Sequence, residues 1–299
     1  MAKPETKAMP LRNGVGASSV TLPPGPWPTV LDFLIERFPR IAASEWAARM
    51  ARGLVCDEGG ARLDASAGYR AGARVRYYRE LDDEPVVAGA ETILFQDENL
   101  LIADKPHGLA VTPGGRYARE TLLARLRQRH DLPELAPLHR LDRDTAGVIA
   151  FSTRLATRSA YQALLRTHQV ERTYEATAAA LPDLAFPQLR RSRIERGEPF
   201  FRMQEVPGEP NSETLIDVAT RAGAHWRYRL QPRTGRKHQL RVHLAALGAG
   251  IVNDPLYPRL RPEAEVAAGP LQLLARSLAF DDPLTGARRS FLSARELEG

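Results

Sequence analysis

The 299-residue sequence contains a single cysteine, Cys56. One thiol cannot form an intramolecular disulfide or a multi-cysteine zinc site, which suits a reducing compartment. The sequence also lacks any uninterrupted apolar stretch of roughly 18 residues, and residues 1–14 lack the apolar core of a signal peptide. It contains no Gly-rich phosphate-binding loop, internal repeat or low-complexity block. We therefore expect a cytoplasmic protein that uses no nucleotide cofactor and binds no membrane.

Positive charge, in contrast, is in excess. The formal net charge is +6 and the sequence pI is about 9.7, as in many proteins that bind polyanions. Residues 186–243 contain 12 Arg and Lys against 6 Asp and Glu, so this segment alone nets +6. The apolar fraction of 43% is enough for an ordinary globular core. The charge favours a nucleic acid partner, although a solvated arginine-rich face would give the same count.

The sequence is organised around residues 139–152, HRLDRDTAGVIAFS. This segment joins a cluster of charged side chains to an apolar run at 148–151 that predicts a buried strand. Asp142 lies between Arg140 and Arg143, a setting that favours the ionised carboxylate which a nucleophile or a base requires. The alternative interpretation is a capped turn with a surface ion pair.

The same segment resembles the signature of the RluA-type pseudouridine synthases. That signature is His-Arg-Leu-Asp, two variable residues, Thr-Ser-Gly and then an aliphatic strand. Residues 139–142, Thr145 and Gly147 match it, and Ala146 stands where the family usually has Ser. The departure removes a hydroxyl group but none of the groups assigned to chemistry.

A second segment strengthens the resemblance. Residues 234–254, TGRKHQLRVHLAALGAGIVND, are followed by Leu256 and Tyr257. They are similar to the family's Thr-Gly-Arg-x-His-Gln-x-Arg-Val-His motif and its Gly-Asp-x-x-Tyr ending. Only Asn253 departs, where family members have Gly.

Two shorter matches complete the resemblance, which extends over residues 92–293. Lys105, Pro106 and Gly108 correspond to a Lys-Pro-x-Gly segment of the family. Residues 172–176, RTYEA, correspond to Lys-x-Tyr-x-Ala, with Arg in place of Lys. A tyrosine in a strand is otherwise most simply a core residue.

The resemblance implies a site and a reaction. It implies Asp142 as the catalytic carboxylate, Arg241 as its basic partner, and Tyr174 as the residue that stacks on the base or helps to remove the C5 proton. Six further residues are expected to bind the substrate, with support of the site as the alternative for Lys105: Arg140, His139, Lys105, Arg236, His238 and Gln239. Arg140 is the candidate for filling the space that a flipped uridine leaves. Uracil is detached from C1′, turned and reattached through C5, so we expect no metal and no other cofactor.

The implied fold is α+β, with a mixed, largely antiparallel sheet in a catalytic domain at residues 92–299. Before it we expect a flexible tail at 1–24, a small domain at 25–84 and a linker at 85–91. The small domain, with two helices and short strands, resembles an S4-type RNA-binding module. Its basic excess over residues 29–80 is thin, 9 basic against 7 acidic residues, so a purely structural domain is the alternative.

Three functions follow from these patterns. The first is an RNA pseudouridine synthase, expected to be a monomer that acts on ribosomal or transfer RNA. The second is a catalytically inactive RNA-binding protein on the same fold. The third is a glycoside or nucleoside hydrolase with Asp142 and Asp144 as paired carboxylates, although residues two apart on a strand share a face and such enzymes draw their acids from opposite sides of the bond.

A metal site is the remaining alternative. His238 and His243 are five residues apart with Gln and Arg between them. This spacing fits neither the usual His-x-x-x-His helix pair nor a site with a ready carboxylate ligand. We therefore expect no metal there.

Overall fold

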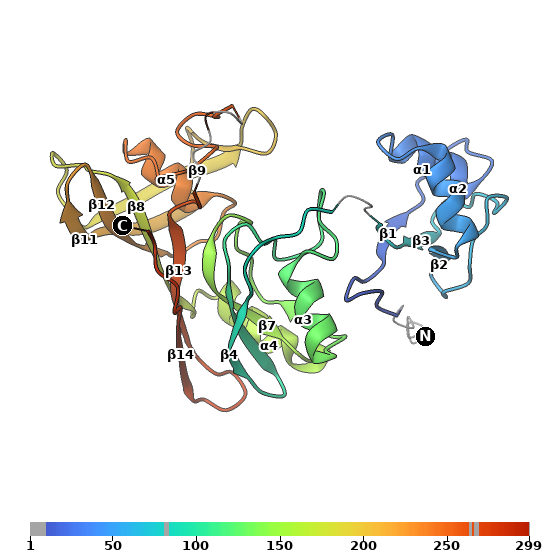
Figure 1. Ribbon diagram of the computed structural model, residues 1–299, viewed down its shortest axis with the longest axis horizontal. Coiled ribbons are helices and arrows are strands. Elements are labelled where there is room, and N and C mark those ends of the chain that lie inside the picture. Colours follow the sequence, from blue (N-terminus) through green and yellow to red (C-terminus); the bar gives the residue numbers. More distant parts are fainter. Residues whose placement is uncertain (1–9, 81–83, 263–264, 266–268, 299) are drawn as a thin grey trace.

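The computed structural model describes residues 10–80, 84–262, 265 and 269–298. Within these residues the chain forms a three-stranded sheet and an eleven-stranded sheet, each with its own hydrophobic core. Figure 1 shows the smaller unit in blue and the larger sheet from green to red. No helix among the described residues is long and apolar enough to cross a membrane.

The smaller unit packs two helices against its sheet. Strands β1 (Ser18–Thr21), β3 (Arg74–Tyr77) and β2 (Val55–Asp57) pair in that order and are antiparallel. Helix α1 (Val30–Arg37) begins with a capping box, in which Thr29 and Asp32 each accept the other's backbone N–H. Helix α2 (Ala43–Ala51) places Trp46 in the core with no exposed surface.

Part of the expected flexible tail belongs to this unit. Val20 of β1 lies opposite Val75 of β3, and Leu22 is 1% exposed in the small core. The tail prediction is therefore corrected for residues 18–22, whereas residues 1–9 lie outside the described residues. A four-residue strand between Gly- and Pro-rich stretches has no periodicity to reveal it, and its partner lies far along the chain.

The segments on either side of the small unit are attached to the larger one. Val15 is buried against α3 (Leu122–His130). In the expected linker region, the Glu84 carboxylate accepts hydrogen bonds from the backbone N–H groups of residues 118–120. Glu91 is 8% exposed and pairs with two arginines of α3. Residues 84–91 are thus an ordered strap on the larger unit rather than a free spacer.

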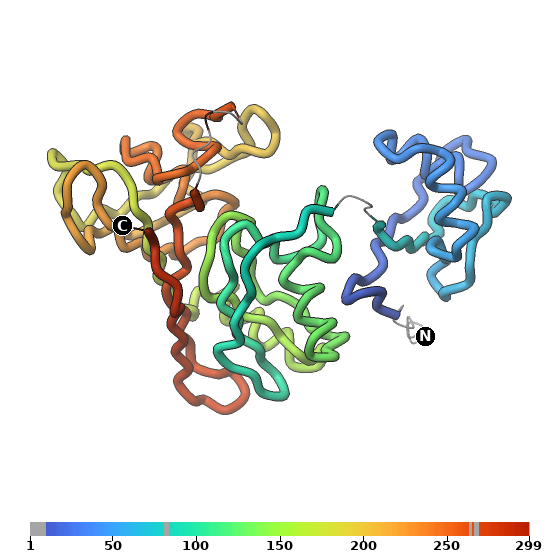
Figure 2. Tube along the Cα trace, in the orientation of Figure 1, coloured from blue at the N-terminus to red at the C-terminus, as the bar shows by residue number. Residues whose placement is uncertain are grey.

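The larger sheet contains most of the strands. Their order is β10 (Met203–Val206), β9 (Gln188–Arg196), β11 (Ser212–Ala222), β12 (His225–Pro232), β8 (Glu171–Ala179), β13 (Leu273–Asp281), β7 (Ala146–Ser152), β5 (Leu100–Lys105) and β4 (Thr92–Gln96). Strand β14 (Arg288–Leu292) forms the long hairpin with β13 that is red in Figure 2, and β6 (Ala136–Pro137) pairs with β7. Every pair is antiparallel except β13 with β7. The predicted mixed, largely antiparallel α+β fold is confirmed.

Helices cover both faces of this sheet. Alternate residues of β5 and β7 point into two cores, since Ile149 packs with α3 while Val148 packs with Tyr161 of α4 (Leu155–Arg166). Helix α5 (Gln239–Ala246) adds Leu240 and Leu244 to the first core. Strand β7 is buried along its whole length, as the apolar run predicted.

The parallel junction between β7 and β13 depends on the signature glycine. Gly147 has φ +110°, and a Cβ atom there would lie 2.2 Å from the carbonyl oxygen of Ala275, so a side chain cannot be accommodated. Its neighbour Ala146 is fully buried against Leu274. At the family's other departure, Asn253 has φ +61°, a left-handed conformation that asparagine tolerates better than most residues. Ala146 and Asn253 therefore fit the backbone that they occupy.

Candidate active site

The turn before β7 presents Asp142 to a pocket. The backbone N–H of Thr145 donates to the Asp142 carbonyl at 3.2 Å, which closes the turn. The pocket, about 550 Å³ in empty volume, is lined by this turn, by β8, by the loop at 232–238 and by α5. It brings together Asp142, Tyr174 and Arg241, the three residues that the sequence assigned to chemistry.

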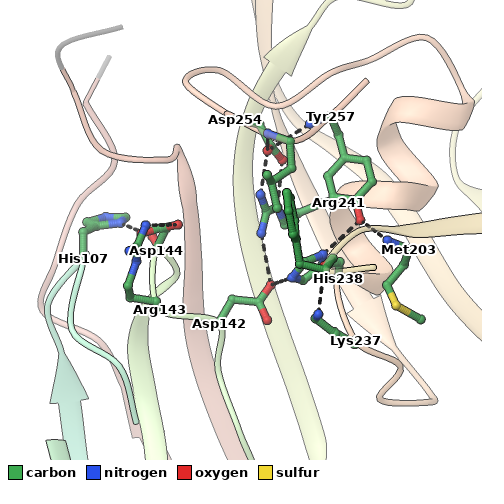
Figure 3. A network of polar contacts seen from close by, with 12 residues as sticks. His107, Asp142, Arg143, Asp144, Met203, Lys237, His238, Arg241, Asp254 and Tyr257 are labelled. Atoms are coloured by element: carbon green, nitrogen blue, oxygen red, sulfur yellow. Dashed lines mark hydrogen bonds and ion pairs between the residues drawn. The ribbon is translucent and has the colours of Figure 1, made fainter. Parts of the chain in front are cut away.

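Arg241 lies between two carboxylates. Its Nη1 is 3.4 Å from Oδ2 of Asp142, as expected from the sequence. Its shorter bonds go to Asp254, at 2.8 Å from Nε and 2.6 Å from Nη2 (Figure 3). Asp254 is fully buried and also accepts the backbone N–H groups of Leu256 and Tyr257. Sequence reasoning placed Asp254 within the second motif but did not identify it as the group that fixes Arg241.

The two carboxylates keep the guanidinium of Arg241 positively charged. Burial works against the charged form of Arg241, which is 2% exposed. The hydrogen bonds and charge of Asp254, and then the charge of Asp142, outweigh burial and raise the pKa of Arg241 above its ordinary value. The cation facing Asp142 is therefore permanent and immobile.

His238 forms a second contact near Asp142. Its Nε2 is 3.9 Å from Oδ2 of Asp142, and its Nδ1 is 2.9 Å from the hydroxyl of Tyr257. Burial lowers the pKa of His238 to about 4, although Asp142 favours the charged form. The Tyr257 hydroxyl accepts the backbone N–H of Met203 at 2.7 Å, which leaves its proton for Nδ1. The imidazole is neutral at physiological pH, and the tautomer that fits these bonds directs its Nε2–H toward Asp142.

Tyr174 forms the wall of the pocket on β8. It is 8% exposed and lies opposite Ala275 of β13. Burial raises its pKa, and Asp142 raises it further against the opposing effect of Arg172. The side chain is therefore a neutral phenol at physiological pH. Arg172, which stands where the family has Lys, lines the same wall and donates to the carbonyls of Pro232 and Thr234 at 3.3 and 3.4 Å.

Cations surround the mouth of the pocket. Arg140 and Arg236 are exposed and line it, as predicted, and Arg236 Nε donates to the Asn211 carbonyl at 2.9 Å. Lys237 also lines the pocket, and its Nζ donates to the carbonyl of Phe201 at 2.8 Å. The sequence analysis missed Lys237 because it occupies the variable position of the second motif.

Lys105 is not available to a substrate. It has no exposed surface, and its Nζ donates to the carbonyls of Pro106, Leu109 and Arg143 at 2.9, 2.8 and 2.9 Å. Burial lowers its pKa to about 7, while Asp144 and Asp142 favour the charged form. The expected substrate contact is corrected to a supporting role, since Lys105 holds the Asp142 turn through the carbonyl of Arg143.

His139 also points away from the pocket. Its Nε2 accepts the backbone N–H of Ala150 at 3.1 Å, and its ring lines a separate apolar cavity beside α4. Burial, followed by the charge of Arg172, lowers the pKa of His139 to about 3. A neutral ring bonded to β7 supports the strand, so the prediction that His139 binds the substrate is corrected.

Gln239 lines the pocket but has no free hydrogen-bonding group. Its Oε1 accepts the hydroxyl of Thr234 and the backbone N–H of Arg236, at 2.8 and 3.0 Å. Its Nε2 donates to the Glu213 carbonyl and to Thr214 Oγ1, at 3.0 and 2.9 Å. Because the amide is saturated, its role is to hold the loop at 232–238 in place, not to bind the substrate.

The second carboxylate of the turn lies on the other side. Asp144 pairs with its neighbour Arg143, with 2.8 Å between Oδ1 and Nε, and its carbonyl is 2.7 Å from Nδ1 of His107. Figure 3 shows this group turned away from Asp142. Asp144 does not line the pocket that Asp142 enters. The opposed pair of acids that a glycoside hydrolase needs is therefore not formed by these two residues.

The two histidines considered as metal ligands are also separated by their contacts. His243 is fully buried, with Nδ1 at 3.0 Å from Thr214 Oγ1 and Nε2 at 3.0 Å from Ser212 Oγ. His238 faces the pocket instead. Among the residues that the structure describes, no three His, Cys, Asp or Glu side chains gather in a way that could hold a metal ion.

Comparison with known proteins adds independent information. Residues 99–246 match the family described as RNA pseudouridylate synthase. The human pseudouridylate synthase RPUSD2 is 34% identical over 182 residues, which are 58% of this chain and 32% of that protein. The chain thus spans about a third of that relative.

The matches to two bacterial relatives cover a larger share of those proteins than the match to RPUSD2 does. The ribosomal large subunit pseudouridine synthase D of Pseudomonas aeruginosa is 32% identical in an alignment of 221 positions that covers 67% of this chain and 67% of that protein. The dual-specificity RNA pseudouridine synthase RluA of Pasteurella multocida is 31% identical in an alignment of 214 positions that covers 67% of this chain and 90% of that protein.

A solved structure shares the fold. Human RNA pseudouridylate synthase domain containing 1 superposes with a TM-score of 0.58 at 21% identity, over 71% of this chain and 86% of that one. This likeness concerns the arrangement of strands and helices alone.

Proposed function

Because this chain belongs to the RluA-type family of RNA pseudouridine synthases, we propose that it converts uridine to pseudouridine in structured RNA, with Asp142 as the catalytic carboxylate. One observation carries the proposal. Asp142 enters the pocket 3.4 Å from an arginine that is itself buried and fixed by Asp254. A carboxylate with a permanent cationic neighbour stays ionised, as attack or proton abstraction at a sugar carbon requires.

The reaction needs this charge at C1′. The C1′–N1 bond of uridine breaks, a C1′–C5 bond forms, N1 gains a proton and the C5 proton is released. Asp142 acts either as a nucleophile on C1′ or as the base that permits a glycal-type intermediate. Both routes use the same ionised carboxylate, and the Nε2–H of His238 at 3.9 Å supports that charge.

Tyr174 stacks on the uracil ring under this proposal. Its raised pKa keeps the phenol protonated at physiological pH, which supports stacking over removal of the C5 proton by a phenolate. The ring lies in the wall of the same pocket as Asp142, so a base placed at the carboxylate would lie along it.

Arg140 fills the space that the target uridine leaves. A uridine in folded RNA must leave the stack, which costs a few kcal/mol. Arg140 is exposed at the pocket mouth beside Asp142, where its planar guanidinium can take the place of the base. Arg236 and Lys237, which also line the pocket, bind the RNA backbone.

The RNA class and the setting are part of the proposal. One relative is named for the large ribosomal subunit and another for dual RNA specificity, so ribosomal or transfer RNA is the proposed substrate class. Action as a monomer is also part of the proposal. The cytoplasm, where such RNA is made and used in bacteria, is the proposed location.

The small unit holds RNA as an S4-like domain in this proposal. A chain that starts at Glu84 retains the strap at 84–91 and tests this idea. It should keep its rate at saturating RNA and need more RNA to saturate. Equal efficiency with and without the small unit would remove the RNA-binding assignment.

The reaction is tested with purified protein and total RNA labelled with tritium at C5 of uridine, from cells that lack the protein. A pseudouridine synthase releases tritium and leaves pseudouridine in the RNA. Release of free uracil would instead identify a hydrolase, and bound but unchanged RNA would identify the inactive RNA-binding alternative. No observation favours the inactive alternative, since Asp142, Tyr174 and Arg241 all line one pocket.

A further inference from the structure

The turn between β9 and β10 exposes two neighbouring aromatic rings. Phe200 is 68% exposed and Phe201 is 37% exposed, and they are the aromatic members of the large exposed apolar side chains among the described residues. Their ring centroids are 5.6 Å apart with an interplanar angle of 79°. Phe200 buries only about a third of its surface in the fold, and together with Phe201 it gives an exposed aromatic pair of the kind that marks an interaction surface.

The turn is attached to the wall of the active-site pocket. Lys237, which lines the pocket, donates its Nζ proton to the carbonyl of Phe201 at 2.8 Å. Arg202 follows Phe201 in the chain, and its guanidinium lies 5.1 Å from the ring centre of Tyr257. The next residue, Met203, donates its backbone N–H to the Tyr257 hydroxyl, the group that also bonds His238. The two rings are therefore held next to the mouth of the site.

The surroundings of the rings are positively charged. Arg140 and Arg196 are exposed, and within the described part of the chain neither forms an ion pair. Both act electrostatically on Lys237, which places them near it. Glu198 is the one acidic residue of the turn at 197–202. By contrast, Arg190 and Arg193 farther along β9 are neutralised by Glu205 and Glu195.

We propose that Phe200 and Phe201 form a stacking platform for an unpaired RNA base that flanks the target uridine. The proposal rests on the function proposed above and names how the same site engages its substrate. When the uridine leaves the stack, Arg140 takes its place, while a flanking base that is itself unpaired can stack on an exposed ring beside the pocket mouth. Aromatic rings among cations are the usual surface for single-stranded RNA. A protein partner would require a larger apolar centre depleted of charge.

The test uses Phe200, whose ring makes the larger exposed surface. Tritium release is measured from total RNA labelled at C5 of uridine, over a range of RNA concentrations. Phe200→Ala should raise the half-saturating RNA concentration about tenfold, with the rate at saturation within about twofold of wild type. Phe200→Trp should behave as wild type and Phe200→Leu as Phe200→Ala, because stacking needs a flat ring. Leu155→Ala, at a residue 63% exposed on α4, is the matched control.

A second measurement separates this idea from the proposed reaction. Binding of a fluorescent single-stranded oligouridylate should weaken in Phe200→Ala whether or not turnover is measured. Equal binding and equal half-saturation in wild type and Phe200→Ala would overturn the platform, and full rescue by leucine would replace stacking with plain apolar contact. Absence of tritium release by the wild-type protein would instead overturn the proposed function.

Discussion

Two aspartates of one turn, Asp142 and Asp144, stand in different electrostatic settings. Asp142 is 17% exposed and faces Arg241, which is buried in α5 and fixed by Asp254. Asp144 is 27% exposed and pairs with the adjacent Arg143, whose side chain is 48% exposed. The first cation comes from a distant part of the chain and cannot move, whereas the second comes from the next residue and is screened by solvent. The two carboxylates are chemically alike. Asp142 is the candidate for catalysis because the fold places a buried, fixed arginine beside it.

The largest expected effect separates the two carboxylates directly. Asp142→Asn keeps the size of the side chain but removes its charge, so the rate of tritium release should fall by at least about 10³-fold. Asp144→Asn should stay within about threefold of wild type, because it lies outside the pocket. RNA binding of both variants is measured in parallel and should change little. Loss of tritium release in both variants would show that the reaction needs both carboxylates and would contradict the assignment of Asp142 alone.

The next effect concerns the two arginines. Arg241→Met leaves Asp254 buried without its partner, so the free energy of unfolding should fall by about 3–5 kcal/mol. Arg143→Met removes an exposed pair and should cost less than about 1 kcal/mol. Urea denaturation of both variants measures the difference. Equal small losses would mean that the Asp254 pair does not hold the site.

Two substitutions of Tyr174 test whether its ring or its hydroxyl contributes to the site. Tyr174→Phe keeps the ring and should retain most of the rate under the stacking proposal. Tyr174→Leu removes the ring and should lose about 1–3 kcal/mol of substrate interaction, measured from the ratio of kcat/KM values. A large loss in Tyr174→Phe would show that the hydroxyl takes part in the chemistry.

The last effect is seen only when the pH is lowered, and it comes from the neutral histidine beside Asp142. The pKa of His238 is lowered to about 4 in the folded protein, below its value of about 6.5 in the unfolded chain. The unfolded chain therefore binds a proton that the folded one does not, and stability falls as the pH drops from about 6.5 to about 4, by about 1.4 kcal/mol per pH unit.

His238→Gln should flatten the dependence of unfolding free energy on pH by that amount within this window. His130→Gln, at an exposed residue of α3, is the control and should leave the slope as in wild type. An unchanged slope in His238→Gln would mean that its ring is protonated in the folded protein.

The motifs predicted which residues meet, and the structure shows why. Asp142, Tyr174 and Arg241 come from three separate segments and line one pocket, as the order of the motifs indicated. The apolar run at 148–151 predicted β7 because a strand buried on both faces needs continuous apolar residues.

Other roles could not be read from the motifs. Lys105 and Gln239 are polar residues of conspicuous motifs, but their bonds go to backbone carbonyls and to neighbouring side chains. The sequence gives the type of a polar side chain but does not show whether that side chain binds RNA or closes a loop. Its role depends on tertiary contacts, as it does for Asp254, which fixes Arg241 from the loop after α5.

The charge count was misleading for the same reason. The run Arg190, Arg191 and Arg193 was the natural candidate for the RNA path, yet each forms an ion pair with a glutamate: Glu205, Glu213 and Glu195, respectively. Two of these acids lie on neighbouring strands, where the sequence does not place them beside the arginines. Arg140, which lines the pocket, and Arg196, which acts electrostatically on Lys237, are instead exposed and form no ion pair among the described residues.

The central claim is that Asp142, and not Asp144, carries the isomerisation. It is tested most directly by mapping pseudouridines in RNA from cells whose own copy of the protein is replaced by wild type, Asp142→Asn or Asp144→Asn. We predict that the Asp144→Asn variant makes every pseudouridine that the wild-type protein makes. The Asp142→Asn variant should make none of them. Pseudouridine at any of these sites in cells with Asp142→Asn would contradict the account.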